Sequence, residues 1–262
     1  MKRVSVPRLA NRMMPRISGE TKCLGIYPAS LTPENVQIAS VPRCMNRAVV
    51  IGAAPSPRGA ELIKADDFVA VCDGGLDYAL AEGIRYELLV GDFDSFSGPL
   101  PELDPGVELI RLPAEKDDTD IGFAVKTLLL RGFRDFLILG GIGGRLDHTL
   151  GNFAVAADIA ARGGLCALTG DNDGEMIYVL RGRSLELTPS AGAYVSIFPW
   201  GCSRAIVTAR GFKYPLEHGA VNARTTLGVS NEFAASGEPA IRGKASITAE
   251  SGTIAVIVSG KL

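Results

Sequence analysis

Six short apolar runs alternate with longer helix-like stretches between residues 48 and 169, and this alternation limits the possible folds more than any other feature. The runs are rich in Val, Ile and Leu and mostly lack polar residues at alternate positions, so each predicts a strand buried on both faces. Strands of this kind pair in parallel and need helical crossovers between them. The expected strands span residues 48–52, 68–72, 88–91, 108–112, 136–140 and 165–169.

Two of the crossovers carry the period of an amphipathic helix. The first, over residues 118–131, repeats its apolar residues at the spacing of one buried stripe and stops at Gly132. The second, over residues 147–161, ends at two glycines. The residues expected to face inward are Ile121, Ala124, Val125, Leu128 and Leu129 in the first helix and Leu150, Phe153, Ala154 and Ala157 in the second.

After about residue 180 the pattern changes to alternating, turn-punctuated segments without a good helix. The expected strands there are 184–188, 194–198, 205–209, 245–249 and 253–258. Both faces of such strands must be covered, which favours a small sandwich over a lone sheet. The sequence therefore predicts an α/β fold, with an N-terminal doubly wound, mostly parallel sheet at 46–180 and a C-terminal antiparallel β-sandwich domain at 181–262.

The first 45 residues need a separate interpretation, because they are basic, contain several prolines and lack a sustained period. An upstream start codon, a flexible arm and a targeting peptide all fit this composition. We favour a flexible or mis-assigned extension at 1–45, with Met45 opening the folded part.

Charge, cysteine content and hydropathy exclude several classes of protein. Residues 1–47 hold eight basic and two acidic residues, so the remainder of a chain with net charge −2 is acidic, which argues against nucleic acid as a partner. No apolar run approaches the ~18 residues of a membrane span. The five scattered cysteines form no Cys-x-x-Cys pair and suit a reducing compartment.

Three acidic clusters, at residues 91–95, 116–120 and 145–148, each follow one of the predicted strands. Ligands of open α/β sheets bind beyond the carboxyl ends of the strands, so these clusters are expected to share one site. Neighbouring carboxylates repel one another and usually gather around a cation, and oxygen ligands suit Mg²⁺. Lys116, Arg145 and the glycine-rich run 140–144 add donors for a polyphosphate.

Each cluster also has a purely structural interpretation. Asp92 and Asp94 point the same way in an extended segment and could hold a metal, or they could form a polar turn. The acids at 117–120, like Asp147, could cap helices. The glycine run matches neither common phosphate-loop pattern, and His148 has no nucleophile beside it.

Taken together, the motifs resemble the thiamine pyrophosphokinase family. In the first half the motifs are Asp73-Gly74-Gly75, Gly91-Asp92-Phe93-Asp94-Ser95, Asp117-Asp118-Thr119-Asp120 and the run from Gly140 through Arg145-Leu146-Asp147-His148 to Asn152. In the second half they are Gly211-Phe212-Lys213-Tyr214-Pro215-Leu216 and Gly228-Val229-Ser230-Asn231-Glu232. The resemblance covers residues 48–262.

The resemblance implies a cytoplasmic thiamine diphosphokinase that transfers the pyrophosphoryl group of Mg·ATP to the hydroxyethyl oxygen of thiamine, giving thiamine diphosphate and AMP. It implies a nucleotide-binding catalytic domain at 46–180, a thiamine-binding domain at 181–262, and a homodimer whose active sites lie between subunits. Nucleic acid and membrane are not expected as partners. The competing hypotheses are a nucleotide-dependent oxidoreductase, against which the missing Gly-x-Gly-x-x-Gly argues, and a non-catalytic nucleotide or thiamine sensor.

Carried over by motif, the resemblance implies three sets of site residues. Asp92, Asp94 and Asp120 are expected to be catalytic and to face the metal, and Asp120 could also deprotonate the attacking hydroxyl. The residues implied for nucleotide or phosphate are Asp73, Gly74, Ser95, Lys116, Thr119, Arg145, Asp147, His148 and Asn152. Those implied for thiamine are Tyr214, Ser230 and Asn231.

Overall fold

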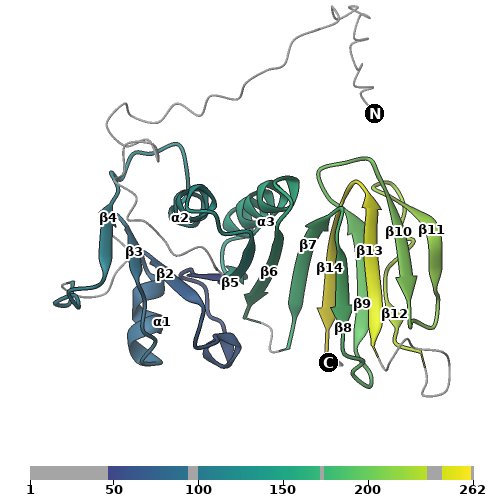
Figure 1. Cartoon of the computed structure of the whole chain (residues 1–262), viewed down its shortest axis with the longest axis horizontal. Helices are drawn as coiled ribbons and strands as arrows, with labels where there is room; N and C mark the ends of the chain where they lie inside the picture. Colours follow the sequence, from purple (N-terminus) through teal and green to yellow (C-terminus); the bar gives the residue numbers. More distant parts are fainter. Residues whose placement is uncertain (1–46, 94–99, 172–173, 235–243, 261–262) are drawn as a thin grey trace, which may run out of the picture.

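The computed structural model describes residues 47–93, 100–171, 174–234 and 244–260. The proposed extension at 1–45, together with Asp94 and Ser95, therefore lies outside the described residues. The described part forms two sheets, one of ten strands and one of four (Figure 1).

The parallel half of the larger sheet confirms all six strands predicted for it. Their order across the sheet is β6-β5-β1-β2-β3-β4, and every neighbouring pair is parallel. The strands are β1 (Ala48–Ile51), β2 (Phe68–Cys72), β3 (Leu88–Gly91), β4 (Glu108–Arg111), β5 (Asp135–Ile142) and β6 (Leu165–Gly170).

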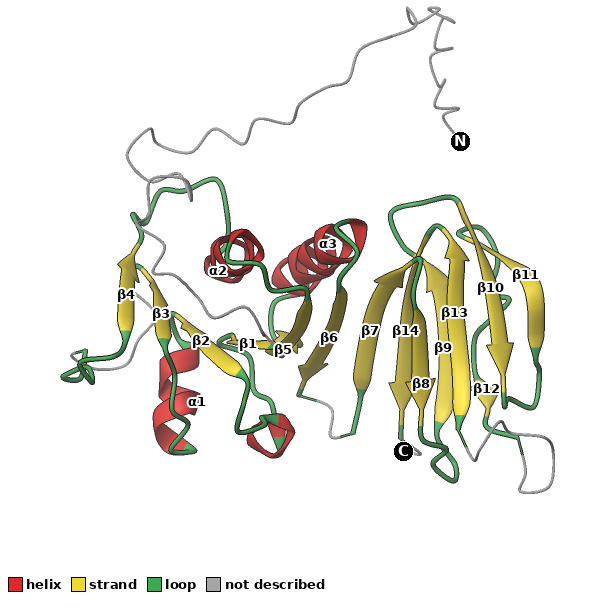
Figure 2. Ribbon diagram, in the orientation of Figure 1, coloured by secondary structure: helices red, strands yellow, loops and turns green. Residues whose placement is uncertain are grey.

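Helices cover both faces of this half (Figure 2). On one face lie α2 (Asp120–Leu130) and α3 (Leu146–Ala161), and on the other lies the short α1 (Gly75–Ala81), with a 3-10 turn, η2 (Gly59–Leu62), following β1. Successive residues of β1 alternate between the two layers: Val50 joins the core under α2 and α3, and Val49 joins the core under α1. The strand is buried on both faces, as its unbroken apolar run predicts.

The buried stripe of α2 agrees with the prediction, whereas that of α3 agrees at Phe153 but not at Leu150 or Ala154. Leu150 is half exposed and Ala154 is exposed, whereas Phe153, Ala156 and Ile159 are buried. The helix packs on β5, β6 and β7 (Met176–Arg181), where Phe153 contacts Trp200 at a centroid distance of 4.7 Å. Because an alanine-rich helix is apolar around much of its circumference, periodicity alone could not select the buried face.

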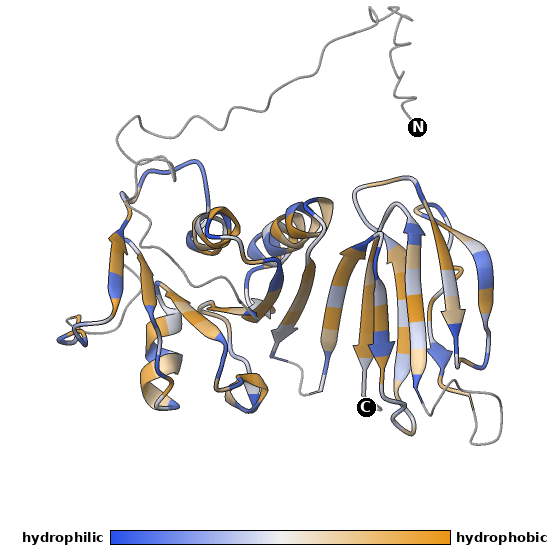
Figure 3. Ribbon diagram, viewed as in Figure 1, coloured by the Kyte–Doolittle hydropathy of each residue, from blue (hydrophilic) through white to orange (hydrophobic). Residues whose placement is uncertain are grey.

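The second half is a sandwich of two antiparallel sheets around its own core. One sheet, β12-β9-β14-β7, continues the parallel sheet through the antiparallel pair β6–β7, and the other is β11-β10-β13-β8. Figure 3 shows the alternation of apolar and polar residues along these strands. The remaining strands are β8 (Ser184–Leu187), β9 (Tyr194–Pro199), β10 (Arg204–Arg210), β11 (Leu216–Asn222), β12 (Asn231–Glu232), β13 (Ala245–Ser251) and β14 (Thr253–Ser259).

The predicted fold class is confirmed, although β7, β11 and β12 were not among the predicted strands. The domain boundary at residue 180 stays a prediction, because β7 joins both halves in one sheet. Within the described ranges, no helix has the length and apolar character needed to cross a membrane.

Candidate active site

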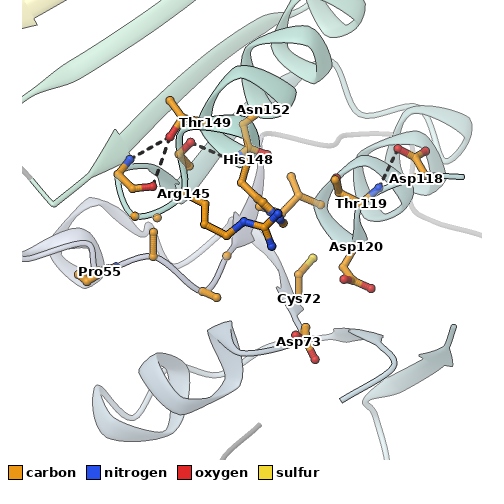
Figure 4. Close-up of a pocket in the computed structure, with 18 of the residues that line it drawn as sticks. Pro55, Cys72, Asp73, Asp118, Thr119, Asp120, Arg145, His148, Thr149 and Asn152 are labelled. Atoms are coloured by element: carbon orange, nitrogen blue, oxygen red, sulfur yellow. Dashed lines mark hydrogen bonds between the residues drawn. The ribbon is translucent and has the colours of Figure 1, made fainter. Parts of the chain in front are cut away.

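The carboxyl ends of the parallel strands surround a cleft of about 690 Å³ (Figure 4). The chain runs outward from β1 to β4 and then returns to β5 on the other side of β1, so the cleft lies at a topological switch point, where open α/β sheets bind ligands. Residues 52–55 follow β1, Asp73 follows β2 and Asp92 follows β3, while the starts of α2 and α3 close the opposite wall.

An ammonium group holds two carboxylates together in this cleft. Lys116 Nζ lies 2.8 Å from Asp92 Oδ2 and 3.2 Å from Asp120 Oδ1, and all three side chains are mostly buried. Asp73 contributes a further carboxylate, and its Oδ1 atom is buried without a hydrogen-bond partner. Asp73 also has a positive φ of 43°, and strained backbone of this kind gathers at functional sites.

Burial raises the pKa of Asp120, and the neighbouring carboxylates of Asp73 and Asp92 raise it further, although Lys116 partly offsets the effect. Burial by itself lowers the pKa of Lys116, but its bonds to Asp92 and Asp120 outweigh this and the pKa is raised. The cluster therefore combines a fixed cation with a carboxylate of increased proton affinity, which is the chemistry needed to neutralise phosphate charge and accept a proton.

The start of α2 has residues that stabilise the helix and a residue that joins the cluster in the cleft. Thr119 caps the helix, because its hydroxyl accepts a hydrogen bond from Gly122 N at 3.0 Å. Asp118 pairs with Lys126 at 2.5 Å and also accepts a bond from Thr119 N. The helix is thus capped by the hydroxyl of Thr119, whereas Asp118 bonds to Lys126 and Thr119 N, and Asp120 turns to Lys116.

The start of α3 is organised around the glycine run. Asn152 is buried and donates to Gly141 O at 2.9 Å, and the hydroxyl of Thr149 accepts from Gly143 N at 3.2 Å. Arg145 and Asp147 instead form an exposed pair at 2.6 Å, with 73% and 64% of their side chains accessible. Arg145 can therefore reorient toward an anion, while Asn152 holds the loop.

Not every cleft residue was found from the sequence. His148 lines the cleft as predicted, but Thr149 and Cys72 were not proposed as site residues, and neither was the loop after β1 at 52–55. That loop is Gly-Ala-Ala-Pro and carries no polar side chain, so the only signal was its position after a strand. Gly74 and Asp147, both predicted as site residues, do not line the cleft, and Asp94 and Ser95 lie outside the described residues.

The residues predicted for thiamine meet one another in the sandwich. Asn231 Oδ1 accepts from Tyr214 N at 3.1 Å, and Asn231 Nδ2 donates to Tyr214 O at 2.8 Å. Ser230 directly precedes Asn231 and has a φ of 57°, and its N–H donates to Ser196 Oγ. Two motifs 17 residues apart therefore form one unit, but none of these residues lines the cleft of the same subunit.

The donors present suit a hard cation. Asp92 and Asp120 supply carboxylate oxygens, and the unpartnered Oδ1 atom of Asp73 has lone pairs that a cation could use. Within the part of the chain that the structure describes, no three His, Cys, Asp or Glu residues form a group that could hold a metal ion. Asp94, the third predicted ligand, lies outside that part.

Comparison with models of known protein families identifies the family of this chain. The model of the thiamin pyrophosphokinase catalytic domain matches residues 60–163, and that of the thiamin pyrophosphokinase vitamin B1 binding domain matches residues 184–248. The chain belongs to the thiamine pyrophosphokinase family. It is an enzyme of the transferase class, and the predicted thiamine diphosphokinase function is confirmed.

Individual relatives agree with this membership. The chain is 28% identical over 165 residues to thiamine pyrophosphokinase of Bacillus subtilis, covering 62% of this chain and 76% of that protein. It is 27% identical over 198 residues to thiamin pyrophosphokinase 1 of Caenorhabditis elegans, covering 70% and 78%. The crystal structure of the Bacillus subtilis protein shares the fold, with a TM-score of 0.68 at 23% identity, covering 83% of this chain and 100% of that chain.

Proposed function

We propose that the cleft binds Mg·ATP and that Asp92, Lys116 and Asp120 act on its phosphates. The observation that carries this proposal is the position of Lys116 Nζ between two carboxylates, at the carboxyl ends of the strands and in the same cleft as the buried, unpartnered Oδ1 of Asp73. Asp92 and Asp120 would hold the metal, with Asp94 completing the predicted set. The bound ion would neutralise phosphate charge and fix the orientation of the polyphosphate.

The chemistry follows from this arrangement of charges. The hydroxyethyl oxygen of thiamine attacks the β-phosphorus of ATP, a new O–P bond forms, the bond from that phosphorus to the α-phosphate oxygen breaks, and AMP leaves with that oxygen. Asp120, whose pKa is raised by burial, would serve in one of two roles, as a ligand of the metal or as the acceptor of the hydroxyl proton. Lys116 and Arg145 would balance the charge on the transferred oxygens.

We further propose that thiamine binds through a second copy of the chain. Tyr214, Ser230 and Asn231 do not line the cleft of their own subunit. Two exposed apolar surfaces suit a contact between copies: Leu146 and Leu150 beside the cleft, and Leu227, Val229 and Tyr214 beside the thiamine motifs. A two-fold dimer would bring each cleft to the partner's sandwich.

A cytoplasmic location is proposed as well. The cysteines in the described residues, Cys72, Cys166 and Cys202, are all free thiols, which suits a reducing compartment.

Product analysis tests the reaction. The purified chain is incubated with thiamine, ATP and Mg²⁺, and the products are separated by chromatography and identified by mass. We expect thiamine diphosphate and AMP in equal amounts, and loss of both with EDTA. Thiamine monophosphate with ADP would contradict pyrophosphoryl transfer.

Subunit complementation tests the shared site. Asp92→Asn and Tyr214→Ala each inactivate one side, and the two inactive variants are mixed under conditions that exchange subunits. With sites between subunits, half of the dimers carry one intact site, so about a quarter of the wild-type activity returns. Sites contained in single subunits would give no recovery.

A further inference from the structure

A buried hydroxyl network fixes the loop that follows β1, and it involves none of the residues assigned above. Ser56 Oγ lies 2.7 Å from Thr169 Oγ1 on β6, and these residues are only 2% and 5% exposed. Tyr78, on α1, donates its hydroxyl hydrogen to Ser56 O at 3.0 Å and accepts one from Ala60 N at 3.0 Å. The loop is therefore attached both to β6 and to α1.

The network is tightly packed around Gly59. A Cβ atom added at Gly59 would lie 2.7 Å from Ser56 Oγ and 3.0 Å from the Tyr78 hydroxyl. The hydroxyls of Ser56 and Thr169, which lie 113 residues apart in the sequence, form a hydrogen bond with each other. Loss of either hydroxyl would leave the other buried without its hydrogen bond.

The segment held by this network is a wall of the cleft. Residues 52–55 line the cleft immediately before Ser56, and Gly52 N is bonded to Leu139 O at 2.9 Å. This segment is anchored at Gly52 by β5 and at Ser56 by β6 and α1.

The wall has no side chain that could adapt to a ligand. Gly, Ala, Ala and Pro present only backbone groups and small apolar surfaces. Recognition through backbone groups depends on where the backbone is held, and a displacement of about 1 Å can cost two orders of magnitude in rate or binding.

We propose that Ser56, Thr169 and Tyr78 are positioning residues that set the affinity of the cleft for its nucleoside triphosphate by holding residues 52–55 in place. This inference rests on the proposed binding of ATP in the cleft. The three residues lie behind the wall, so they affect substrate binding through the loop and do not take part in phosphoryl transfer.

The test compares Ser56→Ala, Thr169→Val, their double variant and Tyr78→Phe with two matched controls. Thr127→Val removes an equally buried hydroxyl from α2, where it donates to Phe123 O. Ser184→Ala breaks a hydroxyl pair of similar length, 2.8 Å to Thr248, on the sandwich. The readouts are kcat, the KM values for ATP and thiamine, and calorimetric binding of a non-hydrolysable ATP analogue.

We expect the KM for ATP and the Kd of the analogue to rise about five- to twentyfold in each network variant, with kcat changed less than about twofold. The KM for thiamine and both controls should stay near wild type. The double variant should be no worse than either single variant of the pair, because both remove the same bond.

Two results would overturn the inference, and they are distinguishable from each other. Unchanged KM and Kd values for nucleotide in folded variants, with only the thermal stability lowered, would make the network purely structural. Failure of the wild-type protein to bind the analogue would refute the proposed nucleotide site and this inference with it. Tyr78→Phe keeps the test valid if the Ser56 or Thr169 variants do not fold, because it releases the same loop through a different bond.

Discussion

Replacing Gly140 by alanine should destabilise the protein strongly, whereas the same change at Gly144 should be mild. Both glycines have left-handed backbone, with φ values of 64° and 59°. They differ in their surroundings: a Cβ at Gly140 would lie 2.2 Å from Ala54 O, whereas a Cβ at Gly144 would have no heavy atom within 4 Å. Comparing the two alanine variants therefore distinguishes the cost of backbone strain, which both share, from the cost of steric overlap, which only Gly140→Ala has.

The expected magnitudes follow from these contacts. Left-handed backbone costs an L-residue roughly 1–2 kcal/mol, which the lower entropy of the unfolded alanine chain reduces by about 0.4–1 kcal/mol. Gly144→Ala should thus cost about 1 kcal/mol. At Gly140 the loop carrying Ala54 must also move, since Cβ contacts under 3.0 Å are essentially never observed. Overpacking adds about 1–3 kcal/mol, for a total of about 2–4 kcal/mol.

Urea denaturation measures the free energy of unfolding of the two variants and of the wild-type protein. The single tryptophan, Trp200, packs against Phe153 of α3, so its fluorescence reports on the contact between the helix layer and the sandwich. We expect the free energy of unfolding to fall about two to four times further for Gly140→Ala than for Gly144→Ala, with similar m-values. Equal losses for the two variants would refute the reasoning, because backbone strain alone would then explain both.

Three further predictions concern the active site and the sandwich. Asp92→Asn should lower turnover by orders of magnitude while circular dichroism stays native, because the site loses a carboxylate beside Lys116; near-wild-type turnover would remove Asp92 from the metal site. Lys116→Met should destabilise the protein by about 1–3 kcal/mol at pH 7 and by less at pH 5, measured by urea unfolding. Without Lys116 the pKa of Asp120 in the folded protein should rise further above its value in the unfolded chain. A carboxyl group whose pKa is higher in the folded protein costs stability as the pH increases from the unfolded-state pKa to the folded-state pKa, so the loss should be larger at pH 7 than at pH 5. A loss of stability that does not depend on pH would contradict this reasoning. Asn231→Ala removes both bonds to the Tyr214 backbone and should raise the KM for thiamine about tenfold while leaving the KM for ATP unchanged in steady-state kinetics; equal changes in both would indicate a general structural defect.

The parallel strands and the position of the cleft were predictable because their signals are local. An unbroken apolar run such as Leu88–Gly91 can only be buried on both faces, and the polar residues that follow it must then lie at the edge of the sheet. The stripe of α2 was equally clear, since Thr119 caps the helix directly before it.

Other features depend on contacts that a linear pattern does not contain. The polar strand Leu216–Asn222 forms because β10 provides a partner, and Met176–Arg181 was passed over where the predicted domain boundary cut through it. The buried face of α3 was predicted correctly at Phe153 but wrongly at Leu150 and Ala154. Alanine gives no preference for one side of a helix, so packing on β5 and β6 determined which side is buried.

By itself the sequence determined which chemical groups the protein has, the strands that each group follows and, through its motifs, the family. Only the tertiary structure decided which of these groups meet. Lys116 joins Asp92 and Asp120 while Asp118 turns to Lys126, and Asn231 closes on Tyr214 in the sandwich, away from the cleft. The physical reason is that strand order, helix rotation and loop anchoring depend on long-range contacts, such as that between Ser56 and Thr169, which link residues far apart in the chain.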